Sequence, residues 1–518
     1  MTSIAVLLLA AAVGFWISHV RRIPSIPLLI LLGVMASWLL PIPEDFLEEA
    51  LILGVTVVVF VAGVEMNPRR VGRFRATAAG IGFLQFFVLG LAGVGSSLLL
   101  GFGVQTAMYL GLAVAASSTL VVLRLLQRRA ELYTPLGRTV MGVLLLQDLL
   151  VILFIPVVTR MGDGALAILA GLAGTVGLMV LAGLHLRYVA PRLIPKVADD
   201  EEFLLLVVLS ILFLFLAISH LMDLPLIGGA FLAGVALSPF PVAVLVRGQV
   251  TSLGDFFSAL FFTALGASLT LPASDEFLQA LALAALVVIV TPPLVILMSE
   301  RAGFSARAGI RGGLLLSQTS EFSLVIGLQG MLLGQIDSGV FSVIALFTVG
   351  TMMLTPVLCT SPVVRTLMRI HPFKEEQSDE ESPEGHILLA GCGVGGITLL
   401  EMLVGTPYPV WVVDDDPAVA DRIREAGFPV IRGDATDVEV LRSAGAHQAR
   451  LVVSMLRRPH DAAPLLALAR DRPVVVRTTD PEDDAWVEER GGVPVSYSEA
   501  GASDFLRWFQ EEEATAVS

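Results

Sequence analysis

The sequence predicts a polytopic α-helical membrane protein that carries a separate C-terminal α/β domain. Of the 518 residues, 55% are hydrophobic, 15% are charged and 48 are glycine, a composition typical of packed membrane helices. Apolar segments follow one another as far as residue 370, and the chain beyond contains 13 Lys and Arg against 28 Asp and Glu. This tail has a formal charge of −15, which argues against nucleic acid as a partner.

Thirteen apolar segments in the first 370 residues have the length and composition of membrane helices. Several contain glycine or proline, which are tolerated in a bilayer where neighbouring helices satisfy the backbone. The first segment has no basic residue before its apolar stretch, so we expect a membrane span there rather than a cleaved signal peptide. The segments are residues 2–20, 24–40, 46–64, 75–101, 104–127, 137–159, 163–194, 202–220, 224–238, 250–271, 276–298, 308–334 and 338–368.

The charges of the loops predict how these spans are oriented. With the acidic tail in the cytoplasm, thirteen spans place the N-terminus outside. The cytoplasmic loops then contain 17 of the 18 Lys and Arg residues before residue 360, and Arg160 is the exception. The positive-inside rule therefore supports a multi-pass, lipid-embedded protein with thirteen spans and its C-terminal domain in the cytoplasm.

Asp148 and its neighbour Gln147 interrupt the apolar run "VLLLQDLLVI" in the middle of a span. A charge at that depth costs roughly 2.5–3.5 kcal/mol on insertion scales, so its presence needs a reason. A structural ion pair is the weaker explanation, because the only basic residue on the same span is Arg138, almost three turns away. A lone buried acid that binds either a proton or a monovalent cation would exchange the two without moving net charge.

Two further groups of polar residues lie inside predicted spans. Small hydroxyl and amide side chains suit a broken membrane helix, because they can bond to the freed backbone groups. The two groups are seven spans apart, so they have opposite orientations, as in an inverted-topology repeat with a midplane substrate site. The candidate ligands are Ser117, Ser118 and Thr119 in the first group and Gln318 and Glu321 in the second.

Each of these features has an alternative explanation. A single Ser or Thr in a membrane helix more often packs or bonds to the preceding turn. Glu321 could instead be the buried partner of an arginine near the start of its helix. Glu65 lies beside Arg69 and Arg70 in the sequence, which favours a structural ion pair. Oxygen ligands of low total charge, including the Gln147 amide, would suit a weakly hydrated cation such as potassium.

The chain resembles the Kef-type branch of the second cation:proton antiporter family over essentially its full length. The matching motifs, in the family order, are "VVVFVAGVEMNPRRV", "ASSTLVVLRLL", "LLLQDLLVI", "LIGGAFLAGVALS", "FFTALGASLTL" and "LLLSQTSEFSLVI". The resemblance implies a homodimer in which a core domain with two crossing broken helices moves against a dimerisation domain. It also implies that Asp148 carries the ion or proton, with residues 117–119 and 317–321 at the crossing.

The same resemblance bears on the transported ion. Relatives with two adjacent aspartates are commonly electrogenic sodium/proton exchangers, whereas a Gln-Asp pair is typical of potassium/proton exchange. Many relatives also have a lysine midway along the eleventh span, where this chain has Pro292 and Pro293. The missing ammonium agrees with electroneutral exchange, but it leaves open which group neutralises the empty site. Sodium/proton exchange therefore stays the main alternative.

The tail carries the pattern of a dinucleotide-binding domain. An acidic run, "KEEQSDEESPEG", predicts an exposed linker over residues 371–384. A buried strand then precedes Gly391, Gly393 and Gly396 and a helix, and the next strand ends at Asp414, 18 residues after the last glycine. Glycines, helix N-terminus and acid in this register predict binding of NAD(H) or an adenine nucleotide, against a purely structural glycine turn.

The "GDATD" stretch around Asp434 resembles the third-strand motif of Trk-N type domains, the regulators of potassium conductance. The resemblance ties Asp434 to the nucleotide pocket and implies a dimeric domain that gates its transporter. Beside the glycines the sequence has no His, Lys or Tyr group suited to hydride chemistry, so we expect a regulatory ligand and no enzyme activity. The two cysteines, Cys359 and Cys392, lie in different regions and indicate no disulfide framework.

The sequence as a whole therefore predicts an electroneutral potassium/proton antiporter that acts in pH homeostasis. Residues 1–370 are the expected exchanger domain, residues 371–384 the linker and residues 385–518 the regulatory domain. A nucleotide-gated potassium channel is a weaker alternative, because the chain lacks a "TVGYG"-like filter. A membrane-anchored dehydrogenase would not require the mid-bilayer carboxylate of Asp148.

Overall fold

The structure is a computed structural model whose chain divides into two compact units. The membrane unit comprises Met1–Arg128, Leu136–Val295 and Arg311–Val363, and the second unit comprises Arg129–Pro135, Ile296–Ile310 and Val364–Ser518. The structure describes residues 2–21, 25–39, 42–66, 75–129, 131–132, 134–197, 200–238, 242–269, 272–304, 306–370, 384–403, 405–456, 458–496, 499, 502–503 and 506. Except for Glu384, the predicted linker lies outside the described residues.

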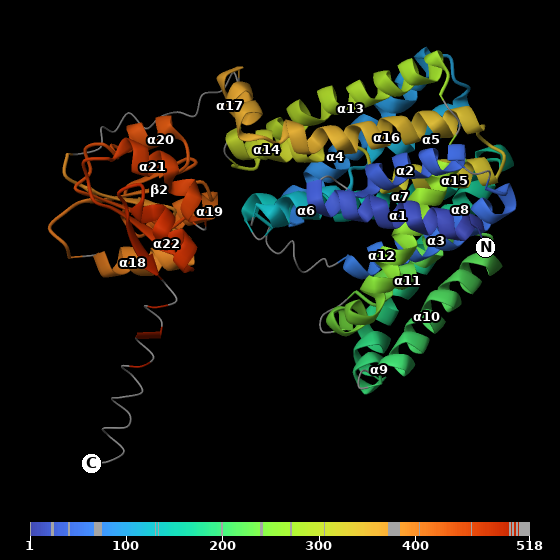
Figure 1. The fold of residues 1–518 in the computed structure, drawn as a ribbon, viewed down its shortest axis with the longest axis horizontal. Coiled ribbons are helices and arrows are strands. Elements are labelled where there is room, and N and C mark those ends of the chain that lie inside the picture. The colour runs from blue at the N-terminus through green and yellow to red at the C-terminus, as the bar shows by residue number, and fades with distance from the viewer. Residues whose placement is uncertain are drawn as a thin grey trace. The chain divides into compact units, whose positions relative to one another are not determined.

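Every predicted apolar segment coincides with one helix or with consecutive helices. Nine helices of the described part of the chain are long and apolar enough to cross a membrane, so a multi-pass membrane protein is confirmed. The helices are α1 (Thr2–Arg21), α2 (Ser25–Leu39), α3 (Glu44–Glu65), α4 (Arg75–Leu99), α5 (Val104–Ala115), α6 (Thr119–Arg128), α7 (Pro135–Thr159), α8 (Ala165–Leu184), α9 (Ala190–Val197), α10 (Glu201–Leu221), α11 (Leu226–Ala236), α12 (Val242–Ser268), α13 (Ser274–Arg301), α14 (Ala306–Leu316), α15 (Glu321–Leu332), α16 (Ser338–Leu358) and α17 (Ser361–Ile370) (Figure 1).

Two of the predicted segments are interrupted at their small polar residues. Between α5 and α6 the backbone is extended at Ala116, with φ −112° and ψ 148°. Between α14 and α15 it is extended at Ser320, whose hydroxyl accepts a hydrogen bond from the N–H of Phe322 at 3.1 Å. Each interruption frees backbone groups in the interior of the membrane unit, and side chains must satisfy them.

In two helix pairs of the membrane unit, a Cβ added at a glycine of either helix would lie within 2.2 Å of a backbone oxygen of the other. A Cβ added at Gly33 of α2 would lie 2.1 Å from the carbonyl oxygen of Thr263 on α12, and one at Gly266 of α12 would lie 2.0 Å from that of Ile30. The pair α3 and α11 has the same arrangement at Gly63 and Gly234, with distances of 2.2 and 2.1 Å. Any side chain at these positions would force the helices apart.

The second unit contains a parallel six-stranded sheet with helices on both faces. The strand order is β3-β2-β1-β4-β5-β6, and every neighbouring pair is parallel, as in doubly wound dinucleotide-binding folds. One core cluster includes residues of α18 and α19 and the other includes residues of α20, α21 and α22. This confirms the predicted Rossmann-like domain, drawn in orange to red in Figure 1. The strands are β1 (Ile387–Ala390), β2 (Val410–Asp414), β3 (Val430–Arg432), β4 (Leu451–Ser454), β5 (Val474–Thr478) and β6 (Val493–Ser496), and the helices are α18 (Val394–Leu403), α19 (Pro417–Glu425), α20 (Val438–Ser443), α21 (Ala463–Leu468) and α22 (Pro481–Glu488).

Candidate functional site

Asp148 lies on α7 in the interior of the membrane unit, and only 4% of its surface is exposed. The hydroxyl of Thr119, the first residue of α6, donates a hydrogen bond to its Oδ2 at 2.9 Å. Its Oδ1 is buried and has no hydrogen-bond partner among the described residues. One oxygen of this carboxylate is therefore held by the protein, and the other is left for a ligand.

Gln147 satisfies a backbone group that the helix break exposes. Its Oε1 accepts a hydrogen bond from the N–H of Ser117 at 3.0 Å, an amide that a continuous helix would have paired internally. A carbonyl oxygen has two lone pairs, so one remains for a ligand. The structure thus gives Gln147 a fixed orientation next to Asp148, while its predicted role as an ion ligand stays a prediction.

Ser117 connects the two broken helices. Its hydroxyl donates to the carbonyl oxygen of Leu316, the last residue of α14, at 2.7 Å. It also accepts from the Nε2 of Gln85 on α4 at 3.0 Å, and the same Nε2 lies 3.4 Å from the Leu316 oxygen. The hydroxyl is therefore occupied by contacts that join the two breaks.

Gln85 is a site residue that the sequence analysis missed. It is fully buried, and its amide donates to both helix breaks through the contacts with Ser117 and Leu316. A signal was present, because Gln85 is a lone amide in the apolar stretch "GFLQFFVLG". A single amide at such a position is weak evidence without knowledge of which helices it faces.

The remaining predicted residues make local contacts, apart from a hydrogen bond that joins the Ser118 side chain to Glu321 of the second break. Ser118 accepts from the N–H of Val121 at 3.3 Å, which caps the start of α6. The Nε2 of Gln318 reaches only the carbonyl of Leu315 in its own segment, at 3.4 Å. Glu321 is 4% exposed, and its Oε2 has no hydrogen-bond partner among the described residues. The structure thus places Thr119 in direct contact with Asp148, whereas the Gln318 amide contacts its own segment.

The proline pair of α13 marks a close contact with α14. The helix continues through Pro292 and Pro293, and a Cβ added at Gly313 of α14 would lie 2.8 Å from the Cα of Pro292.

Among the described residues, no group of three or more His, Cys, Asp or Glu side chains could hold a metal ion. The buried site in this part of the chain is built around a carboxylate rather than a chelating cluster.

The glycine loop of the second unit has the geometry that the fingerprint predicts. Gly391 has φ +79°, a conformation that favours glycine, and its N–H donates to the carbonyl of Val413 at 2.8 Å. A Cβ added at Gly396 would lie 3.0 Å from the Gly391 oxygen, so this glycine allows close packing of the helix on the strand. A Cβ at Gly393 would meet nothing within 4 Å. The space above Gly393 fits the approach of a pyrophosphate.

Asp414 at the end of β2 faces the same loop. Its Oδ2 accepts from the N–H of Cys392 at 2.6 Å, and its Oδ1 accepts from the N–H of Asp416 at 2.9 Å. Burial raises the pKa of the Asp414 carboxyl above its usual value, and these hydrogen bonds partly offset the rise. Burial and the nearby Asp414 raise the pKa of the Cys392 thiol to about 12. Asp414 therefore lies against the glycine loop, and its contact with the ribose hydroxyls of a nucleotide stays a prediction.

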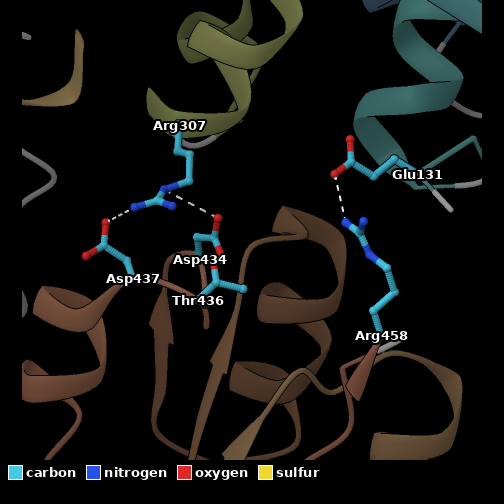
Figure 2. Close-up of polar contacts among 6 residues, drawn as sticks. All are labelled: Glu131, Arg307, Asp434, Thr436, Asp437 and Arg458. Carbon is cyan, nitrogen blue, oxygen red and sulfur yellow. Dashed lines mark hydrogen bonds and ion pairs between the residues drawn. The ribbon is translucent and has the colours of Figure 1, made fainter. Parts of the chain in front are cut away.

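Asp434 lies next to Asp414 at the carboxyl edge of the sheet, because the N–H of Gly433 donates to the Asp414 backbone oxygen at 3.1 Å. Its Oδ1 accepts from the N–H and hydroxyl of Thr436 at 2.8 and 2.6 Å. Its Oδ2 lies 3.4 Å from Nε of Arg307 in the first turn of α14, and Arg307 also pairs with Asp437 (Figure 2). The edge of the predicted nucleotide pocket is thus tied to residues 296–310, which belong to the same unit.

A second ion pair ties the tail to the turn before α7. Arg458, after β4, lies 3.2 Å from Glu131, and it also pairs with Asp461 (Figure 2). The turn at 129–135 leads directly into α7, the helix of Asp148. The two segments that the tail holds by ion pairs are therefore continuous with helices that build the buried site.

This fold and these two sites define a cation/proton exchanger of the multi-pass membrane class that carries a nucleotide-binding type of α/β domain. The family model described as "Sodium/hydrogen exchanger, transmembrane" matches residues 4–365, and the TrkA-N domain matches residues 387–497. The chain therefore belongs to the sodium/hydrogen exchanger family, whose members are transporters and not enzymes. The resemblance on which the sequence analysis relied is confirmed.

Similar proteins agree with this assignment. The glutathione-regulated potassium-efflux system protein KefC of Enterobacter sp. (strain 638) is 28% identical over 445 residues, which cover 81% of this chain and 69% of the relative. KefC of Escherichia coli (strain K12) is 28% identical over 444 residues, with the same coverage of 81% and 69%. The sodium proton antiporter MjNhaP1 of Methanocaldococcus jannaschii has a similar structure, with a TM-score of 0.56 and 17% identity over 71% of this chain and 98% of that chain. At that identity the likeness shows the fold alone.

Proposed function

We propose that this protein is an electroneutral potassium/proton antiporter in which Asp148 binds a proton and a cation alternately. The observation that carries the proposal is the half-satisfied carboxylate: Oδ2 accepts from Thr119, and buried Oδ1 has no partner among the described residues. An isolated buried anion is unfavourable, so a proton or a cation must accompany it. Because either ligand leaves the site neutral, the exchange moves no net charge.

The surrounding residues supply the remaining oxygen ligands in this proposal. Gln147, held by the Ser117 amide, offers its second lone pair. Ser117, Ser118 and Thr119 orient the first break, and Gln318 and Glu321 belong to the second. Potassium is the proposed cation because the site has neutral oxygens around one carboxylate, and because the curated relatives are named potassium-efflux system proteins. Sodium/proton exchange is the alternative.

The proposed architecture is a thirteen-span exchanger domain over residues 1–370 with inverted repeats and crossing broken helices. Support comes from contacts between the two breaks, since Ser117 donates to the Leu316 carbonyl and Ser323 of α15 donates to the Ala113 carbonyl of α5. We further propose a homodimer in a bacterial-type inner membrane with the N-terminus outside. The linker at 371–384 and the regulatory domain at 385–518 are then cytoplasmic.

The tail is proposed to bind NAD(H) or an adenine nucleotide as a regulatory ligand. The open position at Gly393, together with Asp414 and Asp434 at the same sheet edge, supports this assignment. When bound, the nucleotide would add phosphate charge at the start of α18, whose backbone N–H groups favour an anion. The ion pairs of Arg307 and Arg458 offer a connection from this pocket to the start of α14 and to the turn before α7.

Exchange by the purified full-length protein in proteoliposomes tests the transport proposal. With the membrane voltage clamped, an outward potassium gradient should drive proton uptake, and lithium, sodium, rubidium and caesium tested at several pH values should rank the cations. Asp148→Asn should abolish cation-dependent proton movement because the amide cannot carry the exchanged charge. The exposed acid Asp275 offers a matched control, and Asp275→Asn should keep the wild-type rate. Exchange that persists in Asp148→Asn would reject the assignment, and a current without proton coupling would indicate a channel.

Titration of the full-length protein with NAD, NADH and adenine mononucleotides tests the regulatory proposal. Binding at micromolar to millimolar concentration, accompanied by a change in exchange rate, is the expected result. If all of these ligands fail to bind in that range, the tail has another role.

A further inference from the structure

A cavity in the membrane unit has acidic residues at several depths. Glu65 at the end of α3, Asp255 of α12 and Glu321 at the start of α15 all line it. Asp255 is exposed and Glu65 is half-buried, whereas Glu321 is 4% exposed. The cavity thus leads from accessible carboxylates to a buried one.

A second, independent observation indicates that Glu321 binds a ligand in this cavity. Its Oε2 is buried and has no hydrogen-bond partner among the described residues. Glu321 is also an electrostatic neighbour of Asp148 and of Glu65, so the carboxylates form a series from the cavity towards the transport site. An unpaired buried carboxylate oxygen at the inner end of an acidic cavity suits a monovalent cation.

One basic residue shares the cavity with these acids. Among the described residues that line it, Arg124 is the only Lys or Arg. Arg124 is on α6, one turn after Leu120, which lines the same cavity, and five residues after Thr119, the hydrogen-bond donor to Asp148. Its Nη1 donates to the hydroxyl of Ser25 at the start of α2 at 2.6 Å. Arg124 is exposed, so its guanidinium lies at the accessible part of the cavity wall, where the Ser25 contact orients it.

We propose that Arg124 is a specificity-determining residue that sets the cation affinity of this cavity. Three carboxylates and one guanidinium leave a formal charge of two negative, so the cavity attracts a cation less strongly than its acids alone would. The described acids do not form a group close enough to chelate a metal ion. The charged side chains of the cavity therefore act on the cation through their electrostatic field. Arg124 thereby supplies, from α6, a fixed positive charge that α13 lacks where Pro292 and Pro293 stand.

This inference rests on the proposed function, because it assumes that the cation on its way to Asp148 passes through the cavity. In proteoliposomes at pH 8, Arg124→Gln should lower the KM for the cation by about fivefold, since a fixed like charge no longer opposes it. The effect should shrink when the ionic strength is raised with a bulky inert cation, because salt screens it. Arg124→Lys retains the charge and should keep the wild-type KM.

Two controls separate the charge from a structural role. Ser25→Ala removes the contact of Arg124 but keeps its charge, so the KM should change little; a KM like that of Arg124→Gln would mean that the hydrogen bond matters and the charge does not. Arg21→Gln removes an exposed charge at the end of α1 that does not line the cavity, and it should have no effect.

Equilibrium binding of radioactive rubidium to the purified full-length protein gives a readout that does not depend on transport. Tighter rubidium binding in Arg124→Gln than in wild type is expected. An unchanged or higher KM together with unchanged rubidium binding would overturn the role of Arg124 while leaving Asp148 exchange intact. If wild type shows no cation-coupled proton movement, the proposed function fails, and the binding comparison still decides the role of Arg124.

Discussion

Two buried aspartates in the described part of the chain, Asp148 and Asp414, are used in opposite ways. Asp414 in the tail accepts hydrogen bonds on both oxygens, from the N–H groups of Cys392 and Asp416. Asp148 in the membrane unit accepts one, from Thr119, and its second oxygen has no partner in the described part of the chain. Both follow a similar plan, a carboxylate beside a backbone turn that frees amide groups.

The difference lies in which side chain satisfies the freed amide. In the tail, the Asp414 carboxylate itself takes the N–H of Cys392. In the membrane unit, the Oε1 of Gln147 accepts the hydrogen bond from the N–H of Ser117, so Asp148 does not have to accept it. An amide beside the acid therefore keeps the carboxylate available for a mobile ligand, whereas a carboxylate such as Asp414, with a hydrogen bond on each oxygen, is suited to hold a loop.

The largest effect on the tail is expected from Gly393→Ala. The added methyl group meets no protein atom within 4 Å, so the fold should keep its thermal stability. It would occupy the space for the pyrophosphate, and the affinity for NADH should fall by about 100-fold, because overpacking costs about 1–3 kcal/mol and 1.4 kcal/mol is tenfold. Calorimetric titration of the full-length protein measures this.

Adenosine is the matched ligand for that prediction, since it has no phosphates. Its affinity should be the same in wild type and Gly393→Ala. An equal loss for adenosine and NADH would show that the loop was distorted, and wild-type NADH affinity would remove the glycine loop from the binding site.

On the membrane side, Gln85→Leu tests whether the contacts between the breaks support exchange. The substitution removes donors to Ser117 and to the Leu316 carbonyl. Each of the two hydrogen bonds contributes about 1 kcal/mol, so the exchange rate should fall about 30-fold. Gln127 on α6 is exposed, and Gln127→Leu should leave the rate unchanged. A wild-type rate in Gln85→Leu would mean that the breaks are held without this amide.

A smaller effect is expected from Arg307→Gln, which disconnects residues 296–310 from the pocket edge. Arg307 is 12% exposed and pairs with Asp434 and Asp437. Loss of such ion pairs should change the nucleotide-dependent part of the exchange rate by about threefold, while nucleotide-free exchange persists.

The charge swap Arg307→Asp with Asp437→Arg provides the control for that prediction. The swapped pair should restore most of the nucleotide response. If the response is the same in Arg307→Gln as in wild type, the signal takes another route.

The smallest signal is expected from the Cys392 thiol. Its pKa of about 12 means that roughly one thiol in ten thousand is ionised at pH 8. Maleimide labelling of the native full-length protein at this position should therefore be negligible at pH 8 and increase only as the pH approaches 12. A Cys359→Ala background isolates the position, and complete labelling at pH 8 would contradict the buried environment next to Asp414.

Local patterns in the sequence were sufficient for much of this structure. The apolar segments, the lone carboxylate of Asp148 and the spacing of the glycines before Asp414 are each encoded within a few dozen residues. The contacts of Gln85 were not predictable in this way, because Leu316 is 231 residues further along the chain. The grouping of residues 129–135 and 296–310 with the tail was likewise invisible, since it depends on ion pairs between distant segments.

The glycine contacts of α2 with α12 and of α3 with α11 carry a mechanical consequence. Where backbones touch, there is no layer of side chains whose rotamers could change. The two helices of a pair therefore cannot slide past each other or separate gradually. The two helices of each pair must therefore move together as one rigid body. A rearrangement that opens a path for an ion then has to occur between helix surfaces that are in contact through side chains rather than through backbones.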